Sequence, residues 1–247
     1  MHDPWQTLRQ VLEAYREILG GALCGFYVHG SLAFGCFSWE KSDLDFLVAV
    51  REPPAQAQKE ALIRVLLHAQ APEKGFEMSV VLAGDCAAGR CPCPYCLHYS
   101  NAHRAAFQAD LAGTCARMQG TDPDLTAHFA VVRHVGRALY GPDPQSFFAP
   151  VPRADYLDSI RQDVRDILKN PAQNPLYAVL NLCRAAAYAR QGQILSKRDG
   201  AVWGAAHLPD RFLPLIQGAQ ESYRAGTAFD PPQDLLTAFC RTVGAQI

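Results

Sequence analysis

Hydrophobic residues in the first 82 positions follow helical spacing in some segments and strand spacing in others. After Asp3 and Pro4, apolar residues recur every three or four positions, which predicts an amphipathic helix that Gly20-Gly21 ends. Short apolar runs predict strands at residues 25–28, 43–50 and 76–82, and helical spacing predicts a second helix at residues 56–70. The order helix, strand, strand, helix, strand indicates a mixed α/β domain.

Helical patterns dominate the chain after Leu82, and strand patterns cease. A loop rich in Gly, Cys and Pro is expected at residues 85–94. Helices are expected at residues 98–112, 125–139, 154–168, 175–191, 197–207, 210–225 and 233–243. Proline-containing breaks at residues 141–144 and 150–152 mark a boundary. We therefore predict an α+β protein, with a mixed-sheet domain at residues 1–151 and an all-α bundle at residues 152–247.

Composition excludes several classes of protein. Of the 247 residues, 23 are Lys or Arg and 24 are Asp or Glu, so the net charge of −1 lacks the basic excess of a general nucleic-acid binder. Hydrophobic residues make up 49%, which is ample for a core without disulfide or metal staples. The N-terminus lacks the basic start and apolar run of a signal peptide, and Asn181 and Arg184 interrupt the best apolar stretch, residues 176–189. We expect a cytoplasmic monomer that binds neither nucleic acid nor membranes.

Two short motifs suggest phosphate and metal chemistry. Gly30-Ser31 ends a predicted strand, where a glycine lets a phosphate approach the backbone closely. Asp43 and Asp45 are two positions apart on the next predicted strand, so their side chains lie on one face. Two such carboxylates repel each other, and a divalent cation between them relieves the repulsion. The pattern suggests Mg²⁺ bridging to phosphates.

Glu77 adds a third carboxylate, on the strand predicted at residues 76–82. If this strand neighbours the aspartates, Glu77 either completes the metal site or acts as general base on an incoming hydroxyl. Either motif alone is more often a turn or a solvated strand edge. The ordered combination on suitable strands favours a catalytic site.

The same residues carry a resemblance to a known superfamily. Gly30-Ser31, eleven residues, and then Asp43-Leu44-Asp45 resemble the signature of the DNA polymerase β-like nucleotidyltransferases. The second half resembles the helical domain of the aminoglycoside adenylyltransferases, the streptomycin and spectinomycin enzymes. The stretches that carry this second resemblance are residues 179–184 and 192–197, Trp203, and residues 208–209. Further stretches similar to the family are residues 110–113, 139–141 and 151–152, so the resemblance extends over both domains.

The resemblance implies a role for each matching residue. Asp43 and Asp45 would bind Mg²⁺, and Glu77 would be the base that deprotonates the drug hydroxyl. Gly30, Ser31 and Ser42 would lie near the triphosphate of ATP, the co-substrate. Arg184, Lys197 and Tyr223 would hold ATP from the helical domain, which places the expected active site between the two domains. Without the resemblance, an interhelical salt bridge would explain Arg184 equally well. A solvated helix start would be the alternative for Lys197, and ordinary core would be the favoured interpretation of Tyr223.

The drug-facing positions differ from those of streptomycin-modifying relatives. The family implies a tryptophan after the loop, where this chain has Ala102 or Ala105, and an acid before the helix that carries Arg184, where it has Asn170 or Asn174. The losses remove an aromatic face and a charge that a large cationic drug would use. We therefore expect a small-molecule aminocyclitol as acceptor, with spectinomycin favoured over streptomycin.

Two alternatives remain open. The same fold can transfer a nucleotide to a protein hydroxyl or an RNA end, or a relative can lose catalysis and act as a nucleotide- or zinc-binding module. Cys86, Cys91, Cys93 and Cys96 suggest a zinc knuckle, yet no second cysteine pair follows at zinc-finger spacing. Free thiols are the favoured interpretation of this loop.

Overall fold

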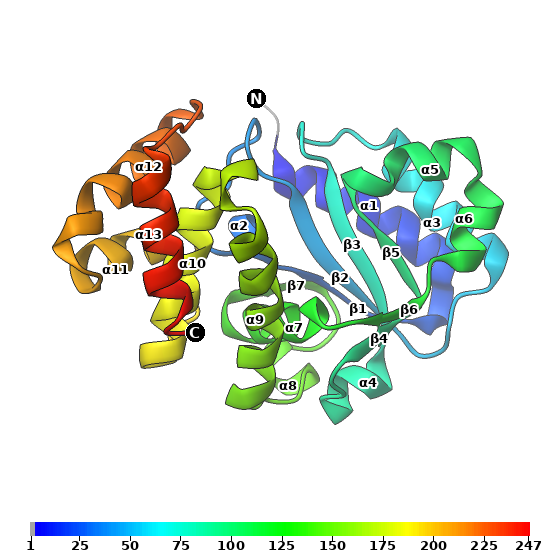
Figure 1. The fold of residues 1–247 in the computed structure, drawn as a ribbon. Helices are drawn as coiled ribbons and strands as arrows, with labels where there is room; N and C mark the ends of the chain where they lie inside the picture. The colour runs from blue at the N-terminus through cyan, green and yellow to red at the C-terminus, as the bar shows by residue number, and fades with distance from the viewer. Residues whose placement is uncertain (1–2) are drawn as a thin grey trace. The chain divides into compact units, whose positions relative to one another are not determined.

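A five-stranded mixed sheet organises the first of two units. The computed structural model, which describes residues 3–247, divides into Met1–Val151 and Pro152–Ile247 (Figure 1). The sheet order is β5-β3-β2-β1-β7; β2 and β3 run parallel, and the other neighbours are antiparallel. The strands are β1 (Leu23–Val28), β2 (Leu44–Val50), β3 (Phe76–Leu82), β5 (Leu97–Tyr99) and β7 (Arg137–Tyr140). A separate two-stranded sheet pairs β4 (Cys93–Tyr95) with β6 (Gly120–Asp122).

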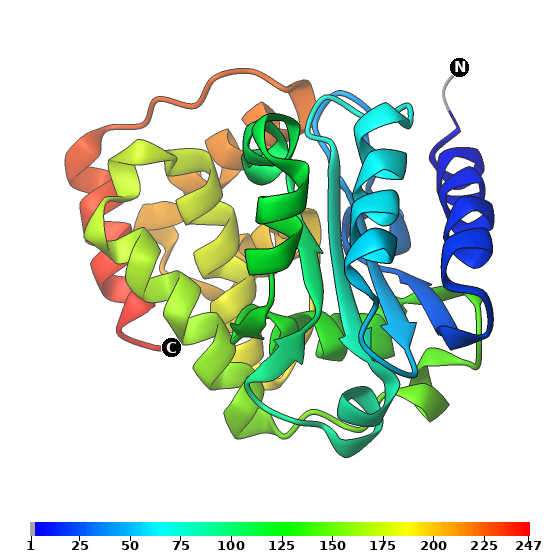
Figure 2. The ribbon, with the colours of Figure 1, turned by 90° about the vertical axis from the view of Figure 1, so that its right-hand side faces the viewer.

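Two long helices cover one face of the sheet. Asp3 caps α1 (Pro4–Leu19) through its side chain, and the apolar faces of α1 and α3 (Gln56–His68) bury strand residues such as Phe26, Phe46 and Met78. Figure 2 shows α1 in dark blue and α3 in cyan side by side. Because side chains alternate along a strand, the residues between these core positions face the other side.

The opposite face is covered only in part by apolar side chains. Tyr27, Leu47 and Val81 pack there with Phe129 of α7 (Asp124–Val135) and with Phe148. Two short helices, α4 (Ala83–Ala88) and α8 (Pro144–Phe147), border this second cluster. The remaining positions on this face are polar, and they form the candidate site described below.

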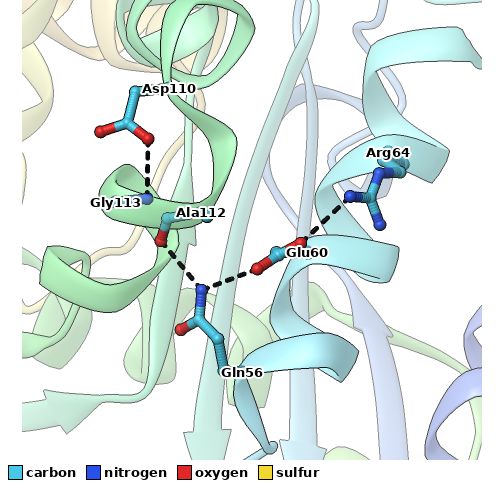
Figure 3. Close-up of polar contacts among 6 residues, drawn as sticks. All are labelled: Gln56, Glu60, Arg64, Asp110, Ala112 and Gly113. Carbon is cyan, nitrogen blue, oxygen red and sulfur yellow. Dashed lines mark hydrogen bonds and ion pairs between the residues drawn. The ribbon is translucent and has the colours of Figure 1, made fainter.

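A polar contact joins α3 to the short helix α6 (Leu111–Arg117), which follows α5 (Arg104–Ala109) (Figure 3). The side-chain nitrogen of Gln56 donates to the carbonyl of Ala112 at 2.9 Å and to Glu60 at 3.0 Å. Asp110 caps α6 by accepting from the backbone N–H of Gly113 at 2.9 Å. These contacts fix the segment that follows β5 against the outer side of α3.

The second unit is built around one buried helix. The five long helices are α9 (Arg153–Lys169), α10 (Pro175–Gln191), α11 (Lys197–His207), α12 (Leu213–Ala225) and α13 (Gln233–Gly244). Helix α10 contacts the other four, and residues 178–183 are all buried. Short 3₁₀ turns occur in this unit at Pro171–Gln173 and Asp210–Phe212, and in the first unit at Gly20–Ala22 and Asn101–His103.

The α+β prediction is confirmed, with errors confined to the middle of the chain. The strands expected at residues 25–28, 43–50 and 76–82 and the helices of the second unit are present to within a few residues. Four short strands were missed, because three or four residues carry too little periodicity to be recognised. The loop expected at 85–94 overlaps α4 and β4. The single helix expected at 98–112 is wrong: this stretch holds the end of β5, a 3₁₀ turn, α5 and the start of α6. The helix expected at 125–139 ends at Val135, where Gly136 introduces β7.

Membrane-spanning helices are not found in the described part of the chain, since each helix there is too short or too polar to cross a bilayer.

Candidate active site

Three carboxylates meet on the polar face of the sheet. Parallel pairing of β2 with β3 sets Asp45 beside Glu77, and Asp43 lies two positions before Asp45 on the same face. One oxygen from each of the three lies within 4.8 Å of the others. The alternate residues Leu44 and Phe46 enter the core under α1 and α3, which fixes the direction of the acids. Within residues 3–247, no other group of His, Cys, Asp or Glu meets this geometric condition for a metal site.

Gly30 makes room for the buried carboxylate of Asp45. Its φ of +59° lies in the left-handed region, and a Cβ added at this position would lie 1.8 Å from the Asp45 carboxylate oxygen Oδ2. The backbone N–H of His29 donates to the Asp45 carbonyl at 3.0 Å, so the turn is held against the start of β2. The chain then forms the short helix α2 (Gly30–Ala33). Glycine is therefore required here by both the backbone and the space.

The two serines predicted near the triphosphate have different surroundings. The hydroxyl oxygen of Ser31, on α2, is buried and has no hydrogen-bond partner among the described residues. The hydroxyl of Ser42 accepts from the backbone N–H of Ser38 at 3.2 Å, and Ser42 donates its own N–H to the Ser38 carbonyl at 2.9 Å. Ser42 thus closes the loop before β2. A role for either serine at the triphosphate stays a prediction.

Two histidines that the sequence did not single out lie beside the acids. Helix α7 brings Nε2 of His128 to 3.8 Å from Oε1 of Glu77, and the rings of His128 and His29 lie 4.9 Å apart. His29 is only 3% exposed; burial lowers its pKa well below the usual value, and His128 lowers it further. His29 is therefore neutral near pH 7. Single histidines at these spacings carry no motif, so no signal in the sequence pointed to them.

The polar face continues along β3 to a third histidine. The hydroxyl of Ser79, two residues after Glu77, lies 2.9 Å from Nδ1 of His98 on β5. Burial lowers the pKa of His98 to about 4, and the neighbouring His103 contributes to the same shift. His98 is neutral at pH 7, so one of its ring nitrogens can exchange a hydrogen bond with Ser79 without carrying charge.

In the second unit, close helix packing positions the predicted ATP-binding cations. A Cβ at Gly200 of α11 would lie 2.7 Å from Cβ of Arg184, so the glycine allows α10 and α11 to approach each other. Lys197 begins α11, one turn before Gly200 and on the same side of the helix. Ser196 caps α11 by accepting from the Asp199 N–H at 3.0 Å. Tyr223 lies on α12, partly buried against the helical core.

The predicted drug-facing positions are exposed. Ala102 lies in the 3₁₀ turn before α5, and Ala105 lies in α5. Asn170 follows α9, and the Asn174 side chain caps α10 by accepting from the Tyr177 N–H at 3.1 Å. Their contribution to acceptor binding stays a prediction.

The cysteine loop has the character of free thiols. All nine cysteines are free. Cys86 and Cys93 are buried, and burial raises the pKa of the Cys93 thiol to about 12. A thiol that stays protonated is a poor metal ligand. The four cysteines of this loop do not meet the geometric condition for a metal site within residues 3–247.

Comparisons with known proteins agree on one group of enzymes. A family model for the C-terminal domain of aminoglycoside adenylyltransferases matches residues 146–246. An aminoglycoside (3'') (9) adenylyltransferase of Rhizobium radiobacter is 27% identical over 190 residues, covering 74% of this chain and 69% of the relative. A protein of the same name from Klebsiella pneumoniae is 26% identical over 224 residues, covering 87% and 84%. The crystal structure of a spectinomycin adenyltransferase from Enterococcus faecialis, solved with ATP and spectinomycin, matches over 99% of both chains with a TM-score of 0.81 at 20% identity, which shows a shared fold.

Proposed function

We propose that this chain, which is similar to the aminoglycoside adenylyltransferases, transfers AMP from ATP to a hydroxyl of an aminocyclitol antibiotic and releases pyrophosphate. The observation that carries the proposal is the cluster of Asp43, Asp45 and Glu77, whose oxygens lie within 4.8 Å of one another. Carboxylates this close repel one another, and a cation bound between them would relieve the repulsion. The expected product is an inactivated drug, so the function is antibiotic resistance.

The donor set fits Mg²⁺. Carboxylate oxygens are the ligands that this hard cation prefers, and Asp43 and Asp45 are the residues that would hold it. When bound, Mg²⁺ would neutralise phosphate charge and orient the triphosphate for in-line attack. Gly30 keeps the Asp45 carboxylate in place, and the buried Ser31 hydroxyl has no hydrogen-bond partner among residues 3–247.

Glu77 is the proposed general base. Its side chain is 33% exposed, so an acceptor hydroxyl can reach it from solvent. His128 lies 3.8 Å away and limits the directions in which the carboxylate can turn. A base must lie within hydrogen-bond reach of the proton it removes, and a partly exposed carboxylate beside the metal ligands satisfies that requirement.

The helical unit supplies the positive charge that ATP needs. The chain carries a net charge of −1, so a triphosphate must be held by local cations. We propose that Arg184 and Lys197 bind the phosphates, with Tyr223 contributing to the nucleotide site. We further propose that the acceptor is a small molecule and that the protein is a monomer. A cytoplasmic location fits the proposal, because ATP is the co-substrate.

We propose spectinomycin as the preferred acceptor over streptomycin. Alanine at positions 102 and 105 offers no aromatic face, and a cation–π contact is worth roughly 0.5–2 kcal/mol. Asn170 and Asn174 lack a charge, and a charge-assisted hydrogen bond is worth about 1.5–3 kcal/mol. A large, highly cationic drug loses more from both changes than a small one.

Pyrophosphate release with ATP and Mg²⁺ across a panel of aminoglycosides tests the activity. Turnover should require an aminocyclitol and should fall roughly 10²–10⁴-fold in Glu77→Gln, while substitution of the exposed Glu73, four residues earlier, by glutamine should leave turnover unchanged. Equal concentrations of the two drugs in competition then test the preference. Faster modification of streptomycin would contradict the preference alone. Turnover with neither drug would favour the alternative acceptors, a protein hydroxyl or an RNA end, or a non-catalytic module.

A further inference from the structure

One carboxylate in the helical unit accepts hydrogen bonds from two neighbours on the next helix. Asp163 lies on α9 and is partly buried. The Tyr177 hydroxyl, from α10, lies 3.0 Å from Oδ1 and 2.9 Å from Oδ2 of this carboxylate. The Asn181 side-chain amide, one turn further along α10, donates to Oδ2. Within residues 3–247, Asp163 forms no ion pair.

Asn181 connects Asp163 to Arg184 through hydrogen bonds of its side-chain amide. A carboxylate only accepts hydrogen bonds and a guanidinium only donates them, so a residue that bridges the two must offer both a donor and an acceptor. The Asn181 amide does this: its nitrogen faces Asp163, and its oxygen accepts from Nε of Arg184. Asn181 is 3% exposed, so solvent cannot replace either partner. Asp163 therefore fixes the amide orientation that holds Arg184.

Tyr177 forms the second branch, which leads to Lys197. The ammonium of Lys197 lies 4.9 Å from the centre of the Tyr177 ring, within cation–π range. Donation of the Tyr177 hydroxyl to a carboxylate increases the electron density of the ring and strengthens this contact. One anion thus reaches two cations through neutral side chains.

We propose that Asp163 is a positioning residue for ATP, which holds Arg184 through Asn181 and Lys197 through Tyr177. The inference rests on the proposed function, because it assumes that these two cations bind the phosphates. Ordering a long side chain during binding weakens affinity by roughly two- to tenfold for each chain. A network that orders both before ATP arrives removes that cost.

Titration calorimetry of the full-length protein with ATP and Mg²⁺ tests the inference. Asp163→Asn keeps the shape and removes the charge, and ATP should bind about five- to fiftyfold more weakly. The matched control is Asp166→Asn, three residues along the same helix, where the exposed carboxylate pairs with Lys169. This control should bind ATP as the unsubstituted protein does. Tyr177→Phe keeps the ring and removes the hydroxyl, so it should give a smaller loss than Asp163→Asn.

A double-mutant cycle separates positioning from a structural role. In an Arg184→Met, Lys197→Met background, Asp163→Asn should have no further effect on ATP affinity if it acts through these cations. The KM for ATP should rise in Asp163→Asn while the KM for the drug stays constant, and loss of fold would move both. If Asp163→Asn unfolds the protein, Tyr177→Phe carries the same test.

The outcomes also distinguish this inference from the proposed function. Unchanged ATP affinity in the Arg184→Met, Lys197→Met protein would overturn the proposed role of the cations. If that protein binds weakly while folded Asp163→Asn binds normally, the positioning role of Asp163 is wrong and the proposed function stands. Equal losses from Asp163→Asn in both backgrounds would show that Asp163 acts on the fold in general.

Discussion

Substitution of Gly30 by alanine should abolish activity by displacing one carboxylate. A Cβ at this position would lie 1.8 Å from Oδ2, 2.5 Å from Cγ and 2.9 Å from Cβ of Asp45. Ordinary van der Waals contact between carbon atoms requires about 3.5–4 Å, so the whole Asp45 side chain must move by more than 1 Å. A misplacement of that size at reacting groups can lower turnover by about 10²-fold. Because Asp45 is buried, it has little space into which to move.

The backbone cost of the same substitution can be measured separately. An alanine with φ near +60° costs roughly 1–2 kcal/mol, offset by about 0.4–1 kcal/mol from the less flexible unfolded chain. Gly192 has a similar φ of +68° in the left-handed region at the end of α10, and a Cβ there would meet nothing within 4 Å. Gly192→Ala therefore carries the strain of a positive φ without the collision, which makes it the control.

Urea unfolding and pyrophosphate release on the two variants form the assay. Both should lose a similar amount of unfolding free energy from the backbone, Gly30→Ala should lose more from the collision, and only Gly30→Ala should lose turnover. Near-normal turnover in Gly30→Ala would refute the argument that this glycine keeps Asp45 in place. Equal losses of turnover in both variants would show that the strain of an alanine at positive φ lowers turnover without displacement of Asp45.

Four further results are expected. Asp43→Asn should abolish transfer without unfolding the protein, because a shared cation loses a charged ligand; circular dichroism and turnover check this. Glu77→Gln should lose roughly 10²–10⁴-fold in turnover while calorimetry shows ATP still bound. Removal of divalent cations with EDTA should weaken ATP binding and stop turnover, and Mg²⁺ should restore both. Since burial lowers the pKa of His98 to about 4, the histidine takes up a proton at higher pH in the unfolded chain than in the folded one. The free energy of unfolding should therefore be unaffected by His98 above about pH 6.5 and should fall by up to about 3 kcal/mol toward pH 4. Urea unfolding of His98→Gln should show a smaller loss over this pH range.

The helical unit was predictable because its helices begin and end with local signals. Asn174 and Pro175 begin α10, and Ser196 caps α11. Such signals lie at the ends of the helix itself, so they can be recognised without tertiary contacts. The strand β7 has no comparable signal, because its four residues form a strand only by pairing with β1. Edge strands of this kind depend on tertiary pairing, which local sequence patterns do not reveal.

The acids of the site were predictable for a related reason. Alternation along β2 sets Asp43 and Asp45 on one face, and the alternate apolar residues Leu44 and Phe46 show which face is buried. His128 could not be found in this way, since it comes from α7 and meets Glu77 only in the folded protein. The sequence did not indicate a role for Asp163 either, because an aspartate on a largely exposed helix is ordinarily in contact with solvent.

The proposed function assigns different charges to the two units. Three carboxylates within 4.8 Å of one another repel a triphosphate, so the sheet alone cannot bind ATP well without a cation. Arg184 and Lys197 attract phosphate, yet the helical unit contains no comparable acid cluster to hold a metal, as judged over residues 152–247. Under the proposed function, the acids would contribute by holding Mg²⁺, and Arg184 and Lys197 would contribute by binding the phosphates. A network that orders these two cations would therefore act on ATP affinity and not on the metal ligands.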